Sequence, residues 1–135
     1  MAQATVQIDV APLYETPSLE NARIDEMLYG MPVQVIEESA GAWCYVRTEY
    51  GTQGYAPASC LDLNVEVATS WKKYKKSGVL SPFIDVQKAP MADAPRLLSV
   101  PRGGLVVALK GPDHNGWQKV GLTSGTIGYT RASYL

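Results

Sequence analysis

The chain has 135 residues, with 12 Lys and Arg against 13 Asp and Glu, so its formal net charge is −1 at pH 7. This near-neutral balance provides no basic field for phosphates, which excludes nucleic acid as an expected partner. The sequence contains no apolar run that approaches the roughly 20 residues of a membrane-spanning helix, so no membrane span is expected.

The N-terminal residues, 1–9, contain a short alternating run from Thr5 to Ile8, which is predicted to form a strand or an ordered arm. This segment lacks the basic start and the apolar core of a signal peptide. The expected location is therefore the cytoplasm, or the cell exterior or cell wall if a leader has been removed.

Residues 10–61 contain several short predicted strands. One covers residues 11–17 and ends at Pro17, two further strands run through Val33–Val35 and Trp43–Val46, and another starts at 54–56. The polar stretch 17–30 is predicted as a loop that closes on Gly30, a residue suited to a turn with positive φ. Residues 57–59 are predicted to form a single helical turn.

Residues 62–83 are predicted to be a linker, with a possible strand at 65–67. The run 71–76 combines four lysines with Trp71 and Tyr74, a mixture that also occurs in anionic-polymer sites. The chain as a whole is neutral, and a run of six residues is too short to outweigh this. We therefore favour the simpler interpretation of a solvated linker whose Trp71 or Tyr74 packs against a neighbouring domain.

An internal repeat organises the chain. Residues 43–61 return as residues 117–135 at an offset of 74, and nine of the 19 aligned positions are identical. The matching positions are Trp43/Trp117, Val46/Val120, Gly51/Gly125, Thr52/Thr126, Gly54/Gly128, Tyr55/Tyr129, Ala58/Ala132, Ser59/Ser133 and Leu61/Leu135.

The repeat extends upstream at an offset of 73, where Leu13 aligns with Val86 and Gly30 with Gly103. Two units follow, 10–61 and 84–135, flanked by the N-terminal arm 1–9 and the linker 62–83. Short strands with Gly and Pro turns at close spacing predict an all-β chain of two small β-barrels in tandem.

The sequence contains no convincing catalytic or metal-binding set. Its two cysteines, Cys44 and Cys60, are both in the first unit and are predicted to be unpaired, packed thiols. The only histidine, His114, is in the second unit, so a Cys–His pair for nucleophilic catalysis is not expected. Metal-ligand spacing is absent as well, and neither a metal nor a cofactor is expected.

Each unit resembles a bacterial SH3 (SH3b) domain. The phrases that carry this resemblance are Gly41-Xaa-Trp43-Xaa-Xaa-Val46 with Gly54-Tyr55-Xaa-Pro57-Ala58-Ser59-Xaa-Leu61, and their second copies that end on Ala132-Ser133-Tyr134-Leu135. The resemblance implies two SH3-like β-barrels joined by the linker.

The first unit also resembles the N-terminal half of NlpC-type cysteine peptidases, the γ-D-glutamyl-L-diamino-acid endopeptidases of peptidoglycan turnover. The phrases Asp25-Glu26-Met27-Leu28-Tyr29-Gly30 and Arg47-Thr48-Glu49-Tyr50-Gly51-Thr52-Gln53-Gly54-Tyr55 carry this likeness. It implies tandem SH3b domains that precede a papain-like catalytic domain, whereas this chain ends at Leu135. The resemblance therefore implies a non-catalytic module whose partners are peptidoglycan or a muropeptide stem peptide and a papain-like peptidase domain.

The first unit is rich in aromatic residues, which offer large contact area at a low cost in entropy. Because Val46 recurs in both units, Cys44 and Val46 are assigned inward and Trp43 and Tyr45 outward. Trp43 and Tyr55 fit a groove or the core equally well, whereas Tyr14 and Tyr50 favour the groove. The predicted ligand-binding residues are Tyr14, Glu15, Tyr29, Trp43, Tyr45, Tyr50 and Tyr55.

Within this set, the resemblance places Glu15 and Tyr50 at the rim of a substrate cleft, where they would recognise the free amine of a stem peptide. A second hypothesis is a protein-interaction module that binds an extended or Pro-rich peptide. The acidic residues that would meet a basic ligand of that kind are only partly present, at Glu15, Glu20, Asp25 and Glu26.

Overall fold

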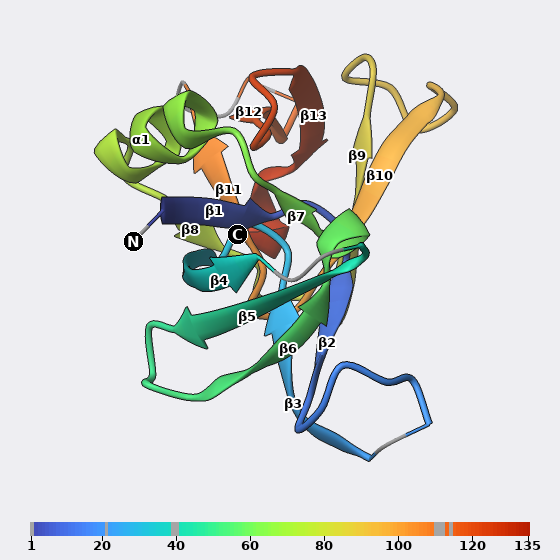
Figure 1. The fold of residues 1–135 in the computed structure, drawn as a ribbon. Coiled ribbons are helices and arrows are strands. Elements are labelled where there is room, and N and C mark those ends of the chain that lie inside the picture. Colours follow the sequence, from blue (N-terminus) through green and yellow to red (C-terminus); the bar gives the residue numbers. More distant parts are fainter. Residues whose placement is uncertain (1, 21, 39–40, 110–112, 114) are drawn as a thin grey trace.

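The chain folds into two antiparallel β-sheets that follow one another in sequence, with one α-helix between them (Figure 1). The computed structural model describes residues 2–20, 22–38, 41–109, 113 and 115–135. The sequence predicts an all-β chain, and the structure is mostly β but includes this α-helix. The strand pairing of the described residues defines sheets, and the division of the chain into two closed barrel domains stays a prediction.

The first sheet has seven strands in the order β3-β2-β6-β5-β4-β1-β7. The strands are β1 (Ala2–Val6), β2 (Val10–Tyr14), β3 (Arg23–Leu28), β4 (Pro32–Glu38), β5 (Trp43–Thr48), β6 (Gln53–Pro57) and β7 (Leu61–Asp62), with the short helix η1 (Ala58–Cys60) before β7.

The second sheet has six strands in the order β10-β9-β13-β12-β11-β8. The strands are β8 (Ser77–Gly78), β9 (Phe83–Gln87), β10 (Arg96–Pro101), β11 (Leu105–Ala108), β12 (Trp117–Gly121) and β13 (Ile127–Arg131), followed by the short helix η2 (Ala132–Tyr134).

The internal repeat is visible in the pairing of the strands. The order β3-β2-β6-β5-β4 in the first sheet corresponds to β10-β9-β13-β12-β11 in the second. The registers agree too, since Val46 pairs with Gly54 and Val120 with Gly128. The repeated sequence therefore encodes the same strand arrangement twice.

The N-terminal segment is part of the first sheet and not a separate arm. Strand β1 pairs with β4, where Ala4 faces Val33, and with β7, where Val6 faces Leu61. The side chains of Ala4, Thr5 and Val6 are all fully buried, and β1 also contacts the helix α1 (Val65–Lys73). Both faces of β1 are thus covered.

Two predictions of local structure are wrong. The loop predicted over 17–30 contains β3, which is an edge strand. Arg23 and Glu26 are exposed and Asp25 is half-buried, and these charged residues obscured the alternation of apolar and polar residues that indicates a strand. The strand predicted at 65–67 is the start of α1. The missed signal is Asn64, whose side chain accepts hydrogen bonds from the amides of Glu66 and Val67 as an N-cap.

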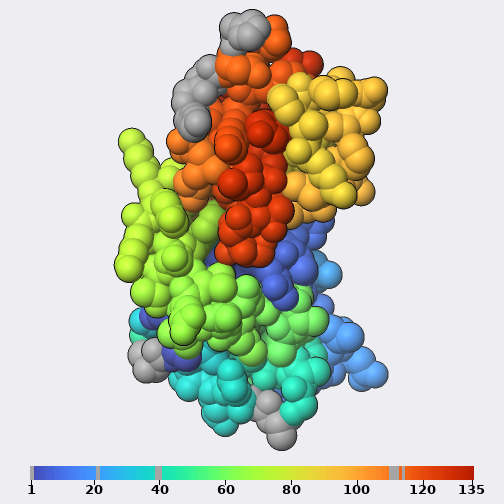
Figure 2. All heavy atoms as spheres, turned by 90° about the horizontal axis from the view of Figure 1, so that it is seen from above, coloured from blue at the N-terminus to red at the C-terminus, as the bar shows by residue number. Residues whose placement is uncertain are grey.

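Helix α1 lies at the side of the junction between the two sheets, as Figure 2 shows with its yellow-green atoms between the two halves. Its Trp71 is buried, and the indole Nε1 donates to the carbonyl oxygen of Gly30 at 2.7 Å. Lys76 Nζ stands 5.7 Å from the Trp71 ring. Of the two residues predicted to pack against a neighbouring unit, Trp71 does so and Tyr74 is exposed. No helix among the described residues has the length and apolar character to cross a membrane.

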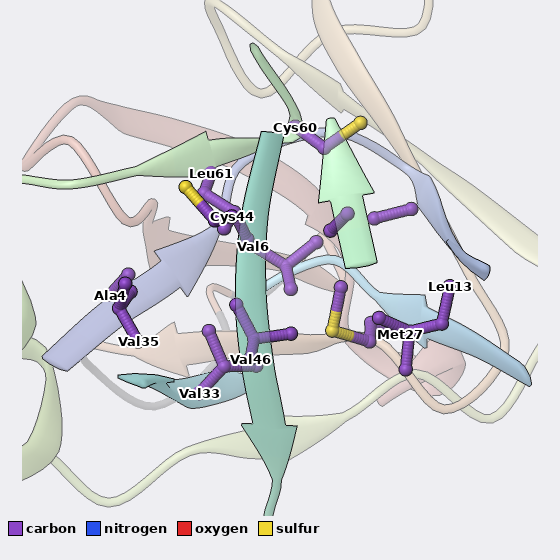
Figure 3. Close-up of a cluster of buried hydrophobic side chains, with 12 residues drawn as sticks. Ala4, Val6, Leu13, Met27, Val33, Val35, Cys44, Val46, Cys60 and Leu61 are labelled. Atoms are coloured by element: carbon purple, nitrogen blue, oxygen red, sulfur yellow. The ribbon is translucent and has the colours of Figure 1, made fainter. Parts of the chain in front are cut away.

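The first core is formed by residues from all seven strands of the first sheet and from η1 (Figure 3). Cys44 and Val46 point into it, whereas Trp43 and Tyr45 are half-buried on the other face, as predicted. Both cysteines are free and buried. The cluster comprises Ala4, Val6, Ala11, Leu13, Met27, Val33, Val35, Cys44, Val46, Ala56, Cys60 and Leu61.

The second core includes one residue of the first unit, Tyr29, beside seven from the second half of the chain. Its hydroxyl lies 3.1 Å from Thr123 Oγ1, and its carbonyl accepts the Leu105 amide at 2.8 Å. The next residue, Gly30, has the predicted positive φ, 83°. The Tyr29–Gly30 turn thus joins the two sheets.

The turn has little free space at Gly30. A Cβ there would lie 2.5 Å from the Leu105 carbonyl oxygen, whereas a Cβ on Gly51, with φ of 89°, would meet nothing within 4 Å. Gly51→Ala should lower the free energy of unfolding by about 1–2 kcal/mol, the cost of a left-handed backbone. Gly30→Ala should lower it by a further amount, about 1–3 kcal/mol, because Leu105 must move.

Urea unfolding of the two variants measures this difference. Because Gly51→Ala carries the same backbone cost, it is the matched control. Equal losses in the two variants would contradict a close contact between the sheets at Gly30.

Candidate functional site

Four aromatic side chains gather on the outer face of the first sheet, and we call this group the aromatic surface: Tyr14, Trp43, Tyr45 and Tyr55. Tyr14 ends β2, Trp43 and Tyr45 alternate with core residues on β5, and Tyr55 is on β6. The register pairs Tyr55 with Tyr45 on one side and with Tyr14 on the other. Three neighbouring strands therefore carry one row of rings, in which Trp43, Tyr45 and Tyr55 are half-buried. Tyr14, predicted as a groove residue, is buried at 6% exposure and supports the other rings from behind.

The rings of the aromatic surface hold one another in place. Tyr14 and Trp43 form an edge-to-face pair, with ring centroids 5.7 Å apart and planes at 85°. Tyr45 and Tyr55 form a tilted pair at 4.8 Å. Such pairs contribute about 0.5–1.5 kcal/mol each beyond the area that they bury. The conformational entropy of these rings is therefore already reduced, which lowers the entropic cost of any contact made on them.

Sequence reasoning missed Gln53 as a member of this site. The Tyr45 hydroxyl donates to Gln53 Oε1 at 3.2 Å, which fixes the outer end of the ring. The spacing of the β5–β6 hairpin could have indicated Gln53. In this hairpin Arg47 pairs with Gln53, two positions beyond the pair of Tyr45 and Tyr55. Residues two apart on one strand share a face of the sheet.

Glu15 and Tyr50 lie on different sides of the first sheet. Glu15 is exposed in the β2–β3 connection directly after Tyr14. Tyr50 is 72% exposed in the β5–β6 turn, and its hydroxyl lies 3.9 Å from Met31 Sδ beside a hollow of about 130 Å³. Figure 1 shows these two connections on opposite sides of the view. The structure therefore does not bring Glu15 and Tyr50 together as one rim.

Tyr29 is corrected from a binding residue to a packing residue. Its side chain is only 2% exposed, so an external ligand has no access to it. Burial raises the pKa of the Tyr29 phenol, while hydrogen bonds with the Thr123 side chain and amide act in the opposite direction. The phenol stays neutral and completes the contact between the sheets.

The two thiols are placed as core side chains. Burial raises the pKa of both Cys44 and Cys60, and the nearby charge of Glu38 adds to the rise at Cys44. A neutral, buried thiol is a poor nucleophile. His114, the histidine that a Cys–His pair would require, lies outside the described residues. Among the described residues, no group of three or more His, Cys, Asp or Glu side chains is placed to hold a metal ion.

Comparison with known proteins finds relatives of this chain. Residues 9–62 match the family model of the bacterial SH3 domain. Over 128 residues the chain is 31% identical to "Dipeptidyl-peptidase 6" of Lysinibacillus sphaericus, an alignment that covers 93% of this chain and 47% of that protein. The chain thus spans about half the length of this curated relative.

The fold is also that of a solved NlpC/P60 family protein from Bacillus cereus. The two superpose with a TM-score of 0.78 at 17% identity, over 98% of this chain and 55% of the other. The predicted resemblance to bacterial SH3 domains and to NlpC-type proteins is confirmed.

The buried phenol of Tyr29 predicts a loss of stability at alkaline pH. Below the ordinary tyrosine pKa, about 10, the phenol is protonated in both the folded and the unfolded chain. As the pH rises past this value, the unfolded phenol ionises while the folded one keeps its proton, so the free energy of unfolding falls. In Tyr29→Phe this fall should be shallower.

Urea unfolding between about pH 8 and 11, a range chosen around the reference tyrosine pKa, measures both slopes. Tyr74→Phe removes an exposed phenol from the end of α1 and is the matched control. If the two variants had the same pH slope, Tyr29 would not be the group that responds.

Proposed function

We propose that the bacterial SH3 domain of residues 9–62 makes this chain a non-catalytic recognition module of a cell-wall hydrolase system. Its ligand is a peptidoglycan stem peptide, and its place of action is the cell exterior or the cell wall. The chain carries no catalytic residues of its own in this proposal, and the chemistry belongs to a papain-like peptidase domain.

The aromatic surface is the observation that carries this proposal. The half-buried rings of Trp43, Tyr45 and Tyr55 form a platform that the buried Tyr14 supports, and the exposed carboxylate of Glu15 follows Tyr14 directly in the chain. Rings supply van der Waals contact to an extended peptide, while a carboxylate complements an amine. An uncharged stretch of peptide with a free amino group fits these two features.

The relatives support the association with a peptidase. The relative from Lysinibacillus sphaericus is named as a peptidase, and this chain aligns with 47% of its length. The same strand order in both sheets supports the finer prediction of two SH3-like barrels, 10–61 and 84–135. In this proposal the second barrel and α1 hold the first in a fixed orientation.

An extended or Pro-rich peptide is the second candidate ligand. It is favoured by the same rings, because aromatic-lined grooves dock the preformed polyproline helix. The two candidates differ in what they need beside the rings: a Pro-rich segment needs no free amine near Glu15.

Sedimentation with insoluble peptidoglycan tests the proposal. Trp43→Ala removes one ring and also frees its partner Tyr14, so the affinity should fall about tenfold or more, as for an anchor residue of an interface. Tyr45→Ala should act in the same direction. Tyr74→Ala removes an exposed aromatic outside this surface and should keep wild-type retention.

Glu15→Gln then separates the two ligands. A stem peptide with a free amine should lose affinity, whereas a Pro-rich peptide should bind this variant as it binds the wild type. Absence of wild-type retention on peptidoglycan, in a chain with unchanged circular dichroism, would overturn the proposal.

A further inference from the structure

The second sheet carries a groove of its own beside Trp117, the residue that corresponds to Trp43 of the aromatic surface. It has a volume of about 560 Å³ and lies between β9, β12, β13 and η2. Two exposed rings belong to it, Phe83 at 60% and Tyr134 at 40% exposure. Trp117 and Arg131 line it as well.

Arg131 is held in this groove by the ring of Trp117. The two residues face each other in the β12–β13 pair, and the guanidinium carbon lies 4.2 Å from the centre of the ring. Arg131 Nη1 also donates to the carbonyl oxygen of Asn115 at 3.4 Å. A stacked guanidinium keeps the planar fork of N–H groups that binds a carboxylate through two parallel hydrogen bonds.

The charge of Arg131 is not neutralised within the groove. Neither of the two ion pairs found among the described residues includes it. The acidic residue of the groove is Asp85, whose Oδ1 accepts from Ser99 Oγ at 2.6 Å and lies 3.9 Å from Arg96 Nη1. Asp85 is therefore engaged by Ser99 and Arg96, and Arg131 is the cation of the groove that forms no ion pair among the described residues.

The equivalent position of the first sheet shows that this cation is specific to the second. Trp43 faces Pro57 as Trp117 faces Arg131. The backbone is nearly the same in both places, with φ and ψ of −58° and 132° at Pro57 and of −70° and 130° at Arg131. The same place in the strand pairing thus holds a tryptophan opposite a proline in the first sheet and a tryptophan opposite an arginine in the second.

We propose that the groove of the second sheet binds the free carboxylate of a peptide. The Arg131 guanidinium receives the carboxylate, Trp117 holds the guanidinium, and Phe83 and Tyr134 cover the apolar part of the peptide. This site is separate from the aromatic surface and does not depend on the function proposed for it.

A pair of small peptides tests the charge requirement. The probes are N-acetyl-trialanine with a free carboxylate and the same peptide with a C-terminal amide, titrated into the isotope-labelled full chain and followed by the NMR signal of the Trp117 indole N–H. The acid should bind about tenfold or more tightly than the amide, the range expected of a charge-assisted, bidentate contact. Equal affinities for the acid and the amide would overturn the proposal.

Variants of Arg131 locate the contact. Arg131→Gln should abolish the preference for the acid, and Arg131→Lys should keep only part of it, because an ammonium is a point charge without the planar fork. Arg23→Gln removes the same charge from an exposed pair on the first sheet and is the matched control. A preference for the acid that survives in Arg131→Gln would contradict the assignment.

The internal repeat offers a gain-of-function test as well. Pro57→Arg places a guanidinium opposite Trp43 on a backbone that already has the conformation of Arg131. This variant should acquire a second site that prefers the acid, reported by the Trp43 indole signal, while Pro57→Gln should not. A Pro57→Arg variant that folds like the wild type but gains no such site would count against the stacked guanidinium as the binding element.

Discussion

The turn at Tyr29 and Gly30 is the contact on which the arrangement of the molecule depends. Three distant parts of the chain hydrogen-bond to it: Trp71 from α1, Leu105 from β11, and Thr123, two residues after β12. Tyr29, Trp71 and Thr123 are buried, so the loss of a partner among them leaves a buried polar group unsatisfied, which costs about 1–3 kcal/mol. The positive φ of Gly30 and its lack of a side chain are what allow the second sheet to approach so closely.

The two sheets show how one strand arrangement can present different chemistry. A tryptophan at the start of the β5 or β12 strand is common to both, and the residue opposite it decides the character of the surface. Next to Pro57 the tryptophan packs edge-on against Tyr14, while next to Arg131 it lies beneath a guanidinium. Side chains on the outer face are free to vary in this way because the inward residues, such as Val46 and Val120, maintain the fold.

Much of the fold was predictable from the sequence, because the repeated phrases place turn and core residues at the same spacing twice. The inward position of Cys44 and the turn at Gly30 follow from alternation and from backbone chemistry. The helix after Asn64 was missed because Val65 and Val67 imitate a strand, and its buried face consists only of Ala68 and Trp71. The separation of Glu15 from Tyr50 depends on the path of the β5–β6 hairpin, and the burial of Tyr29 depends on a partner 94 residues away. No local sequence pattern indicates either the separation of Glu15 from Tyr50 or the burial of Tyr29.

The pairing of β1 with β7 has a consequence for synthesis on the ribosome. The N-terminal strand β1 can take its place between β4 and β7 only after Leu61 and Asp62 have left the exit tunnel. The first sheet is therefore completed only after its last strand has been synthesised, although β1 is made first. From then until Thr123 emerges, the Tyr29 hydroxyl faces solvent without its native partner. At about 5–20 residues per second, that interval lasts several seconds. During this time the nascent chain exposes the surface of the first sheet that the second will cover, which makes this the stage at which a chaperone or a neighbouring nascent chain has access to it.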